Sequence, residues 1–466
     1  MAAEKTNEMT SDITVYGATG SVGKYAVQYL LEASKANEQP IKIILAGRNE
    51  TKLKKIQEDI TSDTCSVDIF VAGSGDAAGL MKMAEQTKVI VNCAGPFVEY
   101  GEHVIAACAK TGTDYVDITG EVYWVADMRQ RYGEDAKKSG ARIVPLSGFD
   151  SIPSDISVLA AVKALREARS NDLQIETATT WHGMTGGVNG GTIQSALRMP
   201  LDINNMFREK NGSFRKGPFL GFDPLSVTHP TEIRFNPKFQ KTKDNMAIVE
   251  WMNQIPSFDR TLGLAFSIPF LMAAVNSKVV NASSISLGYG ENFKYRERHL
   301  PLGFPMTTIL GMFSAIPGLI FMYFLMCFSV LLKLPIVGQK LADFMFPPGS
   351  SPPDMLNQTC RSEVYAEVAS KAASPTQEGN LDIGACHIKF KGDPGNLVTA
   401  QCVCESAMAL IHNRSELPER SNDGFGTPAE IIGDVLLKRF SENKVRPVEI
   451  TTATKKDIST TTSLLC

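Results

Sequence analysis

A glycine-rich loop between a short apolar segment and a helix-like segment constrains the fold of this chain more than any other feature. Residues 13–16 are β-branched or aromatic, Gly17, Gly20 and Gly23 follow at once, and residues 24–33 have a helical pattern. Glycine allows a tight turn and lets the backbone approach a pyrophosphate, while the helix N-terminus supplies N–H donors. The order of strand, loop and helix predicts a nucleotide site, and the alternative is a structural turn.

The same alternation of strand and helix continues over the first 160 residues. Residues 41–45, 89–92, 115–118 and 142–145 have strand patterns, and residues 50–60 have a helical pattern. Strands that alternate with helices of this length are typical of a parallel, doubly wound α/β sheet. We therefore expect residues 1–160 to form a nucleotide-binding domain. Its loop residues are Gly17, Ala18, Thr19, Gly20, Ser21, Val22 and Gly23.

The end of the second strand indicates which nucleotide is bound. NAD sites place an acid there to hold the ribose hydroxyls. Here Arg48 follows the strand, and no carboxylate precedes Glu50. A guanidinium suits a 2′-phosphate, so the pattern favours NADP(H) over NAD(H). The alternatives for Arg48 are a helix cap or a solvent-facing side chain.

The ends of the later strands hold the remaining candidate residues. Ala94, Gly95 and Pro96 follow the strand at 89–92, where small residues would let a nicotinamide ribose lie against the backbone. The candidates for a proton donor are Tyr100, His103, Glu121 and Asp150. Each has a structural alternative, because His103 suits a helix start and the segment 148–155 suits a capped strand-to-helix turn.

Five motifs occur in an order that resembles a known family. They lie at residues 17–23, 46–48, 92–96, 117–121 and 147–155. Together they resemble the saccharopine dehydrogenase-like oxidoreductases, a eukaryotic group found at lipid droplets and mitochondria, and the mycobacterial trans-acting enoyl reductases. The resemblance implies a Rossmann domain, a nicotinamide cofactor and oxidoreductase activity. It implies no particular substrate.

Four further regions follow the first domain. We expect an α+β substrate or dimerisation domain over residues 161–298, an apolar segment over 299–340, a return of the globular part over 341–448, and a frayed tail over 449–466. Cys386, His387, Cys402 and Cys404 have no usual zinc spacing, so we expect core cysteines and no metal site.

The apolar segment predicts association with a membrane. No charged side chain lies between Arg298 and Lys333, and a bilayer core needs about 20 apolar residues in a helix. Pro317 and Gly318 divide the run, which suits a monotopic hairpin in a lipid-droplet monolayer as well as a spanning helix. The alternative is a buried helical hairpin at a homodimer interface.

Composition limits the class of partner and the compartment. The 466 residues include 47 Lys and Arg against 50 Asp and Glu, which disfavours nucleic-acid binding. Nine scattered cysteines and a polar start at residues 1–5 disfavour secretion. A lipid droplet is the favoured location, with the mitochondrial membrane or the endoplasmic reticulum as alternatives.

These features predict an NADP(H)-dependent reductase that transfers hydride to a carbonyl, enoyl or imine group of a small lipophilic substrate at a membrane or lipid-droplet surface. The alternative from another class is a non-catalytic, cofactor-binding or structural lipid-droplet protein, because a fold does not dictate a function. A soluble saccharopine-type dehydrogenase is disfavoured, since no cluster of Arg and Lys lies near the motifs.

Overall fold

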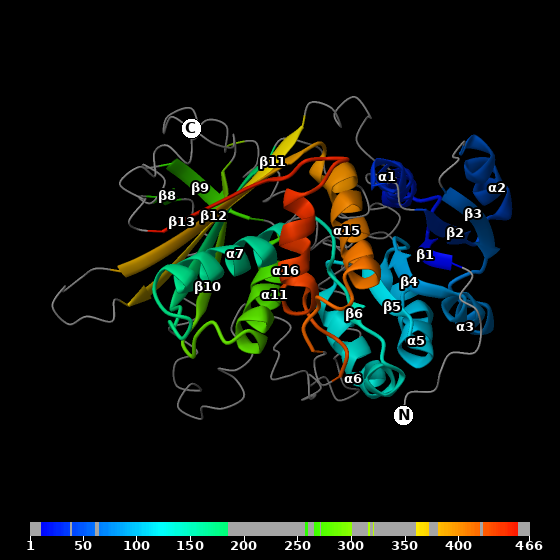
Figure 1. Ribbon diagram of the computed structural model, residues 1–466, viewed down its shortest axis with the longest axis horizontal. Helices are drawn as coiled ribbons and strands as arrows, with labels where there is room; N and C mark the ends of the chain where they lie inside the picture. The colour runs from blue at the N-terminus through cyan, green and yellow to red at the C-terminus, as the bar shows by residue number, and fades with distance from the viewer. Residues whose placement is uncertain are drawn as a thin grey trace.

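Two β-sheets lie side by side, with helices between them (Figure 1). The computed structural model describes residues 11–37, 40–60, 65–184, 257–259, 265–270, 272–300, 316, 320, 360–371, 381–419 and 423–454. The first sheet belongs to the N-terminal part of the chain. The second is assembled from the middle and the C-terminal part.

The first sheet has six parallel strands in the order β3-β2-β1-β4-β5-β6. This is the strand order of a Rossmann fold, so the predicted parallel, doubly wound sheet is confirmed. Its elements are β1 (Ser11–Tyr16), α1 (Ser21–Asn37), β2 (Ile41–Gly47), α2 (Glu50–Asp59), β3 (Cys65–Val71), α3 (Ala77–Glu85), β4 (Thr87–Asn92), α4 (Phe97–Tyr100), α5 (Glu102–Thr111), β5 (Asp114–Asp117), α6 (Val122–Ser139) and β6 (Ile143–Val144).

Side chains of the central strands alternate between two cores. Val89 and Val91 enter the core shared with α1, whereas Ile90 enters the core shared with α3 and α5. This alternation follows from the period of two along a strand. Both faces of the sheet are therefore covered. The edge strand β3 has no fully buried residue, which is why its weak apolar pattern gave no strand prediction.

The second sheet has seven strands in the order β13-β12-β11-β7-β10-β9-β8. Neighbouring strands are antiparallel except for β7 and β10. Its strands are β7 (Thr177–Met184), β8 (Ser257–Asp259), β9 (Ala265–Pro269), β10 (Lys294–Leu300), β11 (Arg361–Lys371), β12 (Leu381–Lys391) and β13 (Glu449–Thr454), and the helices α7 (Ile152–Ala168) and α11 (Ala273–Ser286) pack against it.

Two of the predicted boundaries differ from the structure. The expected end of the first domain at residue 160 falls inside α7, because this helix begins at the edge of the first sheet and packs on β11 and β12 of the second. The expected frayed tail is wrong for Glu449–Thr454, since these residues form β13 and pair with β12. The pairing partner is distant in sequence, so local composition could not reveal it.

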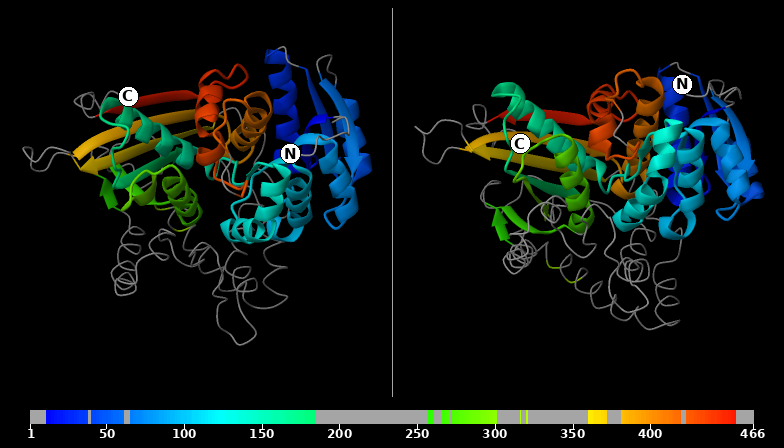
Figure 2. Two further views of the ribbon diagram at one scale, coloured as in Figure 1. Left: turned by 60° about the horizontal axis from the view of Figure 1, so that its bottom comes forward. Right: turned by 90° about the horizontal axis from the view of Figure 1, so that it is seen from below.

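The chain returns to the first sheet near its C-terminal end. A short π-helix (Pro394–Val398) leads into α15 (Thr399–His412), which packs beside α1, and α16 (Pro428–Ser441) packs on α15 and α7. Figures 1 and 2 show α15 and α16 between the two sheets. The predicted core cysteines Cys402 and Cys404 are fully buried in α15. The first domain is thus completed by residues from the far end of the chain.

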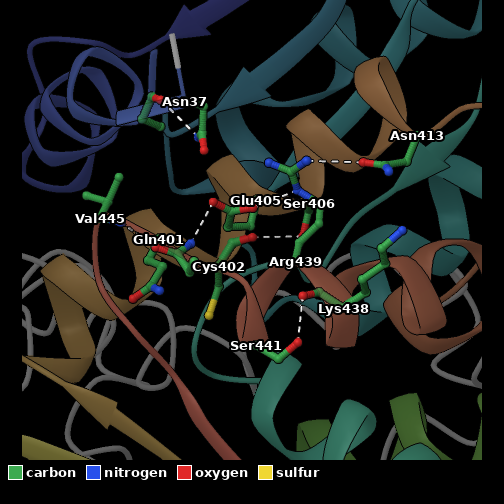
Figure 3. A network of polar contacts seen from close by, with 12 residues as sticks. Asn37, Gln401, Cys402, Glu405, Ser406, Asn413, Lys438, Arg439, Ser441 and Val445 are labelled. Atoms are coloured by element: carbon green, nitrogen blue, oxygen red, sulfur yellow. Dashed lines mark hydrogen bonds and ion pairs between the residues drawn. The ribbon is translucent and has the colours of Figure 1, made fainter. Parts of the chain in front are cut away.

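A buried polar network holds this return in place. Glu405 on α15 accepts hydrogen bonds from the Tyr29 hydroxyl at 2.6 Å, Arg439 Nε at 2.7 Å and Asn443 Nδ2 at 2.8 Å. Arg439 also donates to Asn413 at 3.1 Å, as Figure 3 shows. Burial, then the charge of Glu405, raises the pKa of Tyr29 well above its usual range, so the hydroxyl keeps its proton. The network joins α1, α15 and α16.

No helix within the described ranges is long and apolar enough to cross a membrane. The apolar segment predicted at 299–340 lies outside those ranges apart from residues 299, 300, 316 and 320. Of these, residues 299 and 300 are the end of β10, so the globular part extends slightly further than the sequence predicted.

We expect Glu405→Ala to lower the free energy of unfolding by about 3 kcal/mol, because it leaves the partly buried Arg439 guanidinium without its counter-ion and the buried Tyr29 hydroxyl without its acceptor. Urea denaturation of the detergent-solubilised protein, followed by tryptophan fluorescence, measures the change. Glu416→Ala is the matched control, since the Glu416–Lys438 pair is exposed and should contribute little. Equal effects of the two substitutions would contradict the role given to Glu405.

Candidate functional site

The glycine loop lies at the carboxyl ends of β1 and β4, where the strand order of the first sheet reverses. Gly17 has a φ of +82°, and a Cβ on it would lie 2.9 Å from the backbone nitrogen of Ala94. A Cβ on Gly23 would lie 2.1 Å from the Gly17 carbonyl oxygen. Only glycine fits these two positions. The first turn of α1 is therefore held directly against the edge of the sheet where ligands of such folds bind.

The loop itself is anchored on the neighbouring strand. The backbone nitrogens of Gly17 and Ala18 donate to the Ala46 carbonyl at 2.9 and 3.3 Å. Ala18, Val22 and Gly23 are buried, so they shape the loop, whereas Gly17, Thr19, Gly20 and Ser21 are partly exposed. The first N–H groups of a helix have no partner inside it. This arrangement fits a pyrophosphate.

Arg48 lies at the same edge, directly after β2, and its side chain is exposed. Burial raises the pKa of Tyr16, the last residue of β1. The nearby Arg48 guanidinium opposes this rise, which shows that the two side chains are close. The first carboxylate after β2, Glu50, pairs with Lys54 at 2.7 Å. The exposed Arg48 at the carboxyl end of β2 thus remains the predicted partner of a 2′-phosphate.

The segment that contains Ala94, Gly95 and Pro96 is held by Glu121. This carboxylate is buried, with Oε1 accepting from the Phe97 backbone nitrogen at 3.2 Å and Oε2 from that of Val98 at 2.7 Å. Glu121 therefore fixes the start of α4 beside the loop. In the structure, therefore, the contacts of Glu121, a predicted proton donor, hold α4 in position.

A second buried acid joins the ends of β5 and β6. Asp117 accepts hydrogen bonds from the backbone nitrogens of Thr119 and Leu146 at 3.0 and 2.9 Å and from the Tyr115 hydroxyl at 2.9 Å. Burial raises its pKa to about 7 in spite of these donors. Asp117 was not among the predicted site residues. Its contacts show that it organises the edge of the sheet.

The candidates Tyr100 and His103 lie on α4 and α5, the two short helices that follow the segment Ala94–Pro96. Tyr100 ends α4 and is partly buried, and His103 is exposed on the first turn of α5. The neighbouring Glu102 binds Arg131 at 2.6 Å and the Tyr132 hydroxyl at 2.9 Å. Exposure of His103 favours the helix-start alternative.

A buried polar cluster that sequence reasoning missed lies close enough to Asp150, the last predicted proton donor, to affect its pKa. We call it the acid cluster; it consists of Glu297 on β10, His182 on β7, Ser154 on α7 and Asn276 on α11. Glu297 Oε1 lies 2.6 Å from Ser154 Oγ, 2.7 Å from His182 Nε2 and 3.0 Å from Asn276 Nδ2. Burial, then the charge of Glu297, raises the pKa of Asp150 to about 6.

Little in the local sequence pattern predicts this cluster. Glu297 lies between Arg296 and Arg298, which is a pattern typical of an exposed strand, and His182 is 115 residues away from it. The pairing of β7 with β10 brings the two together. The contact of His182 with Glu297 could have been predicted only from knowledge that β7 pairs with β10 in this parallel register.

A cavity of about 330 Å³ lies at the opposite, amino end of the first sheet, lined by residues that include Asn37, Ile41, Glu405 and Arg439. Ile41 begins β2, so the cavity is on the side away from the glycine loop. The Glu405 carboxylate already accepts three hydrogen bonds there. The Glu405 carboxylate in this cavity is therefore occupied by contacts within the protein.

Comparison with known proteins agrees with the geometry. Residues 13–144 match the family model described as the saccharopine dehydrogenase NADP binding domain. This match confirms the predicted NADP(H) cofactor and, with the relatives below, the predicted resemblance. The first part of the chain is the nicotinamide-nucleotide-binding domain of an oxidoreductase.

Relatives extend the similarity over most of the chain. A putative trans-acting enoyl reductase of Mycobacterium tuberculosis is 29% identical over 441 residues, which cover 92% of this chain and 95% of the relative. A lipid droplet localized protein of Caenorhabditis elegans is 27% identical over 444 residues, which cover 91% and 94%. The apo L-Glu-forming saccharopine dehydrogenase of Saccharomyces cerevisiae superimposes with a TM-score of 0.47 at 10% identity, covering 95% of this chain and 100% of that chain.

We expect Gly23→Ala to weaken NADPH binding about tenfold or more, because the added methyl displaces α1 from the Gly17 carbonyl and moves its N-terminus. Quenching of protein fluorescence by NADPH measures the affinity, and circular dichroism checks the fold. Gly73→Ala is the control, since a Cβ at Gly73 meets nothing within 4 Å. Unchanged affinity in a folded Gly23→Ala variant would show that the loop does not bind the nucleotide.

Proposed function

We propose that this protein is an NADPH-dependent reductase that transfers hydride to a carbonyl, enoyl or imine group of a lipophilic substrate at a membrane or lipid-droplet surface. The observation that carries the proposal is the glycine loop, packed against the carboxyl edge of an NADP-binding domain with Arg48 beside it. A nicotinamide cofactor supplies a hydride equivalent at such an edge.

Different residues would hold different parts of the cofactor. The first turn of α1, with Thr19, Gly20 and Ser21, would bind the pyrophosphate. Arg48 would pair with the 2′-phosphate. The segment Ala94–Pro96, held by Glu121, would support the nicotinamide ribose. All of these lie at the carboxyl ends of β1, β2 and β4.

Among the four predicted proton donors, Asp150 has the best-matched environment. Its pKa of about 6 means that a fraction of the carboxyl groups keeps a proton at neutral pH, which general acid catalysis requires. Glu121 is already engaged by two backbone nitrogens. Tyr100, at the end of α4, is partly buried and is the second choice.

Two observations support a lipophilic substrate. Relatives of similar length are described as trans-acting enoyl reductases and as a lipid droplet localized protein. This chain also has its own uncharged run between Arg298 and Lys333. A run of that length favours a position at a lipid surface, where an apolar substrate is concentrated.

We expect Arg48→Ala to raise the Kd for NADPH about tenfold or more and to leave the Kd for NADH nearly unchanged, because only NADPH has the 2′-phosphate that the guanidinium would meet. Fluorescence titration of the detergent-solubilised protein with each nucleotide measures both values. Lys52→Ala, one helical turn further on, is the control. If neither nucleotide binds the wild type, the enzyme proposal fails and a structural lipid-droplet protein remains.

We expect Phe324→Asp with Cys327→Asp to release the protein from lipid, since a charged residue costs roughly 3 kcal/mol at the centre of an apolar segment. Flotation with triolein droplets coated by a phosphatidylcholine monolayer measures the bound fraction. Ser350→Asp, in the Pro-rich segment that follows, is the control. Equal flotation of the double variant and the wild type would place the lipid contact elsewhere.

A further inference from the structure

The segment Ala94–Pro96 is held at both ends by buried side chains. Its first backbone nitrogen donates to Asn92 Oδ1 at 3.0 Å. Directly after the segment, the backbone nitrogens of Phe97 and Val98 donate to the two carboxylate oxygens of Glu121 at 3.2 and 2.7 Å. Asn92 and Glu121 are both buried. Two buried groups therefore set the path of the backbone that would support the nicotinamide ribose.

A chain of hydrogen bonds through Asp117 joins these two supports. On one side, Asn92 Nδ2 donates to the Tyr115 hydroxyl at 3.1 Å, and this hydroxyl donates to Asp117 Oδ2 at 2.9 Å. On the other side, Asp117 Oδ1 accepts from the Thr119 backbone nitrogen at 3.0 Å, and the Thr119 hydroxyl accepts from the Glu121 backbone nitrogen at 3.0 Å. All five residues are buried. A buried network holds its members rigidly when each has its partner, so the two supports are fixed relative to one another.

The same residue holds the turn that leads to Asp150. Asp117 Oδ1 accepts from the Leu146 backbone nitrogen at 2.9 Å, and the Asp117 carbonyl accepts from that of Ser147 at 2.8 Å. Leu146 has a φ of +61°, and within the described ranges it is the one residue other than glycine with a positive φ. Such strained backbone persists only where the surrounding structure holds it, and it occurs most often at functional sites. Asp117 therefore ties the end of β6 to the support of the nicotinamide ribose.

We propose that Asp117 is a positioning residue for hydride transfer, which holds the backbone under the nicotinamide end of the cofactor through Asn92 and Glu121. Its side chain is fully buried, so it acts through these neighbours and makes no contact with the cofactor itself. The rate of hydride transfer depends on how the nicotinamide ring is oriented towards the substrate, and a fixed support sets that orientation. The inference rests on the proposed reductase function and adds the residue that organises its nicotinamide end.

Two ligands separate the two ends of the cofactor in a binding experiment. NADPH carries both the 2′-phosphate and the nicotinamide, whereas 2′,5′-ADP keeps the adenine end with its phosphates and lacks the nicotinamide. Isothermal titration of the full chain in detergent gives a Kd for each ligand. Loss of a support at the nicotinamide end raises the Kd for NADPH alone, while general damage to the domain raises both values.

We expect Asp117→Asn to raise the Kd for NADPH about fivefold and to leave that for 2′,5′-ADP nearly unchanged. The amide oxygen of the variant still accepts from the backbone nitrogens of Thr119 and Leu146. Its NH₂ group then meets the Tyr115 hydroxyl, which already accepts from Asn92 and loses the acceptor for its own proton. The chain therefore breaks at this one link. The fluorescence emission of the bound reduced nicotinamide should move towards that of free NADPH.

Two tyrosine variants make the test specific. Tyr115→Phe breaks the same link and keeps the charge of Asp117, so it should raise the Kd for NADPH by a similar factor. It also serves in place of Asp117→Asn if circular dichroism shows that the latter does not fold. Tyr29→Phe is the matched control, because it removes a buried hydroxyl from another buried carboxylate, Glu405, at the amino end of the first sheet. This control should lower stability and change neither Kd.

The outcomes separate this inference from the proposed function. Folded variants that keep the wild-type affinity for NADPH and the wild-type nicotinamide emission would overturn the positioning role and leave the reductase standing. Variants that lose NADPH and 2′,5′-ADP by the same factor would overturn it too, since the damage would then extend beyond the nicotinamide end. A wild type that binds neither ligand would reject the reductase, and the positioning role with it.

Discussion

The close approach of Gly23 to the Gly17 carbonyl is the contact on which the rest of the molecule depends. Because a Cβ at Gly23 would lie 2.1 Å from that oxygen, α1 can begin at the edge of the sheet only with glycine there. The position of α1 then sets where Tyr29 meets Glu405 on α15. Through Glu405 and Arg439 the same helix also positions α16. The nucleotide site and the C-terminal return are thus fixed by one steric constraint.

The segment from Leu146 to Asp155 connects the two sheets and divides two acids between different tasks. Asp150 is a candidate proton donor, and burial, then the charge of Glu297, raises its pKa to about 6. Asp155, on the first turn of α7, accepts from the Ser283 hydroxyl at 2.6 Å and from the Ala429 backbone nitrogen at 2.8 Å, and so joins α7 to α11 and α16. Burial raises the pKa of Asp155 to about 7. A buried acid that is fully hydrogen-bonded to the framework, as Asp155 is, has a structural role.

Local patterns predicted the first sheet well and the acid cluster not at all. The glycine loop, Arg48 and the strands that follow are signalled within a few residues each, because turns, caps and parallel strands depend on local backbone geometry. Glu121 was predicted only as a candidate proton donor, and its contact with Val98 needs a fold in which β5 ends beside α4. His182 and Glu297 meet through the pairing of β7 with β10. Such contacts depend on register, which a single sequence with long intervening segments does not determine.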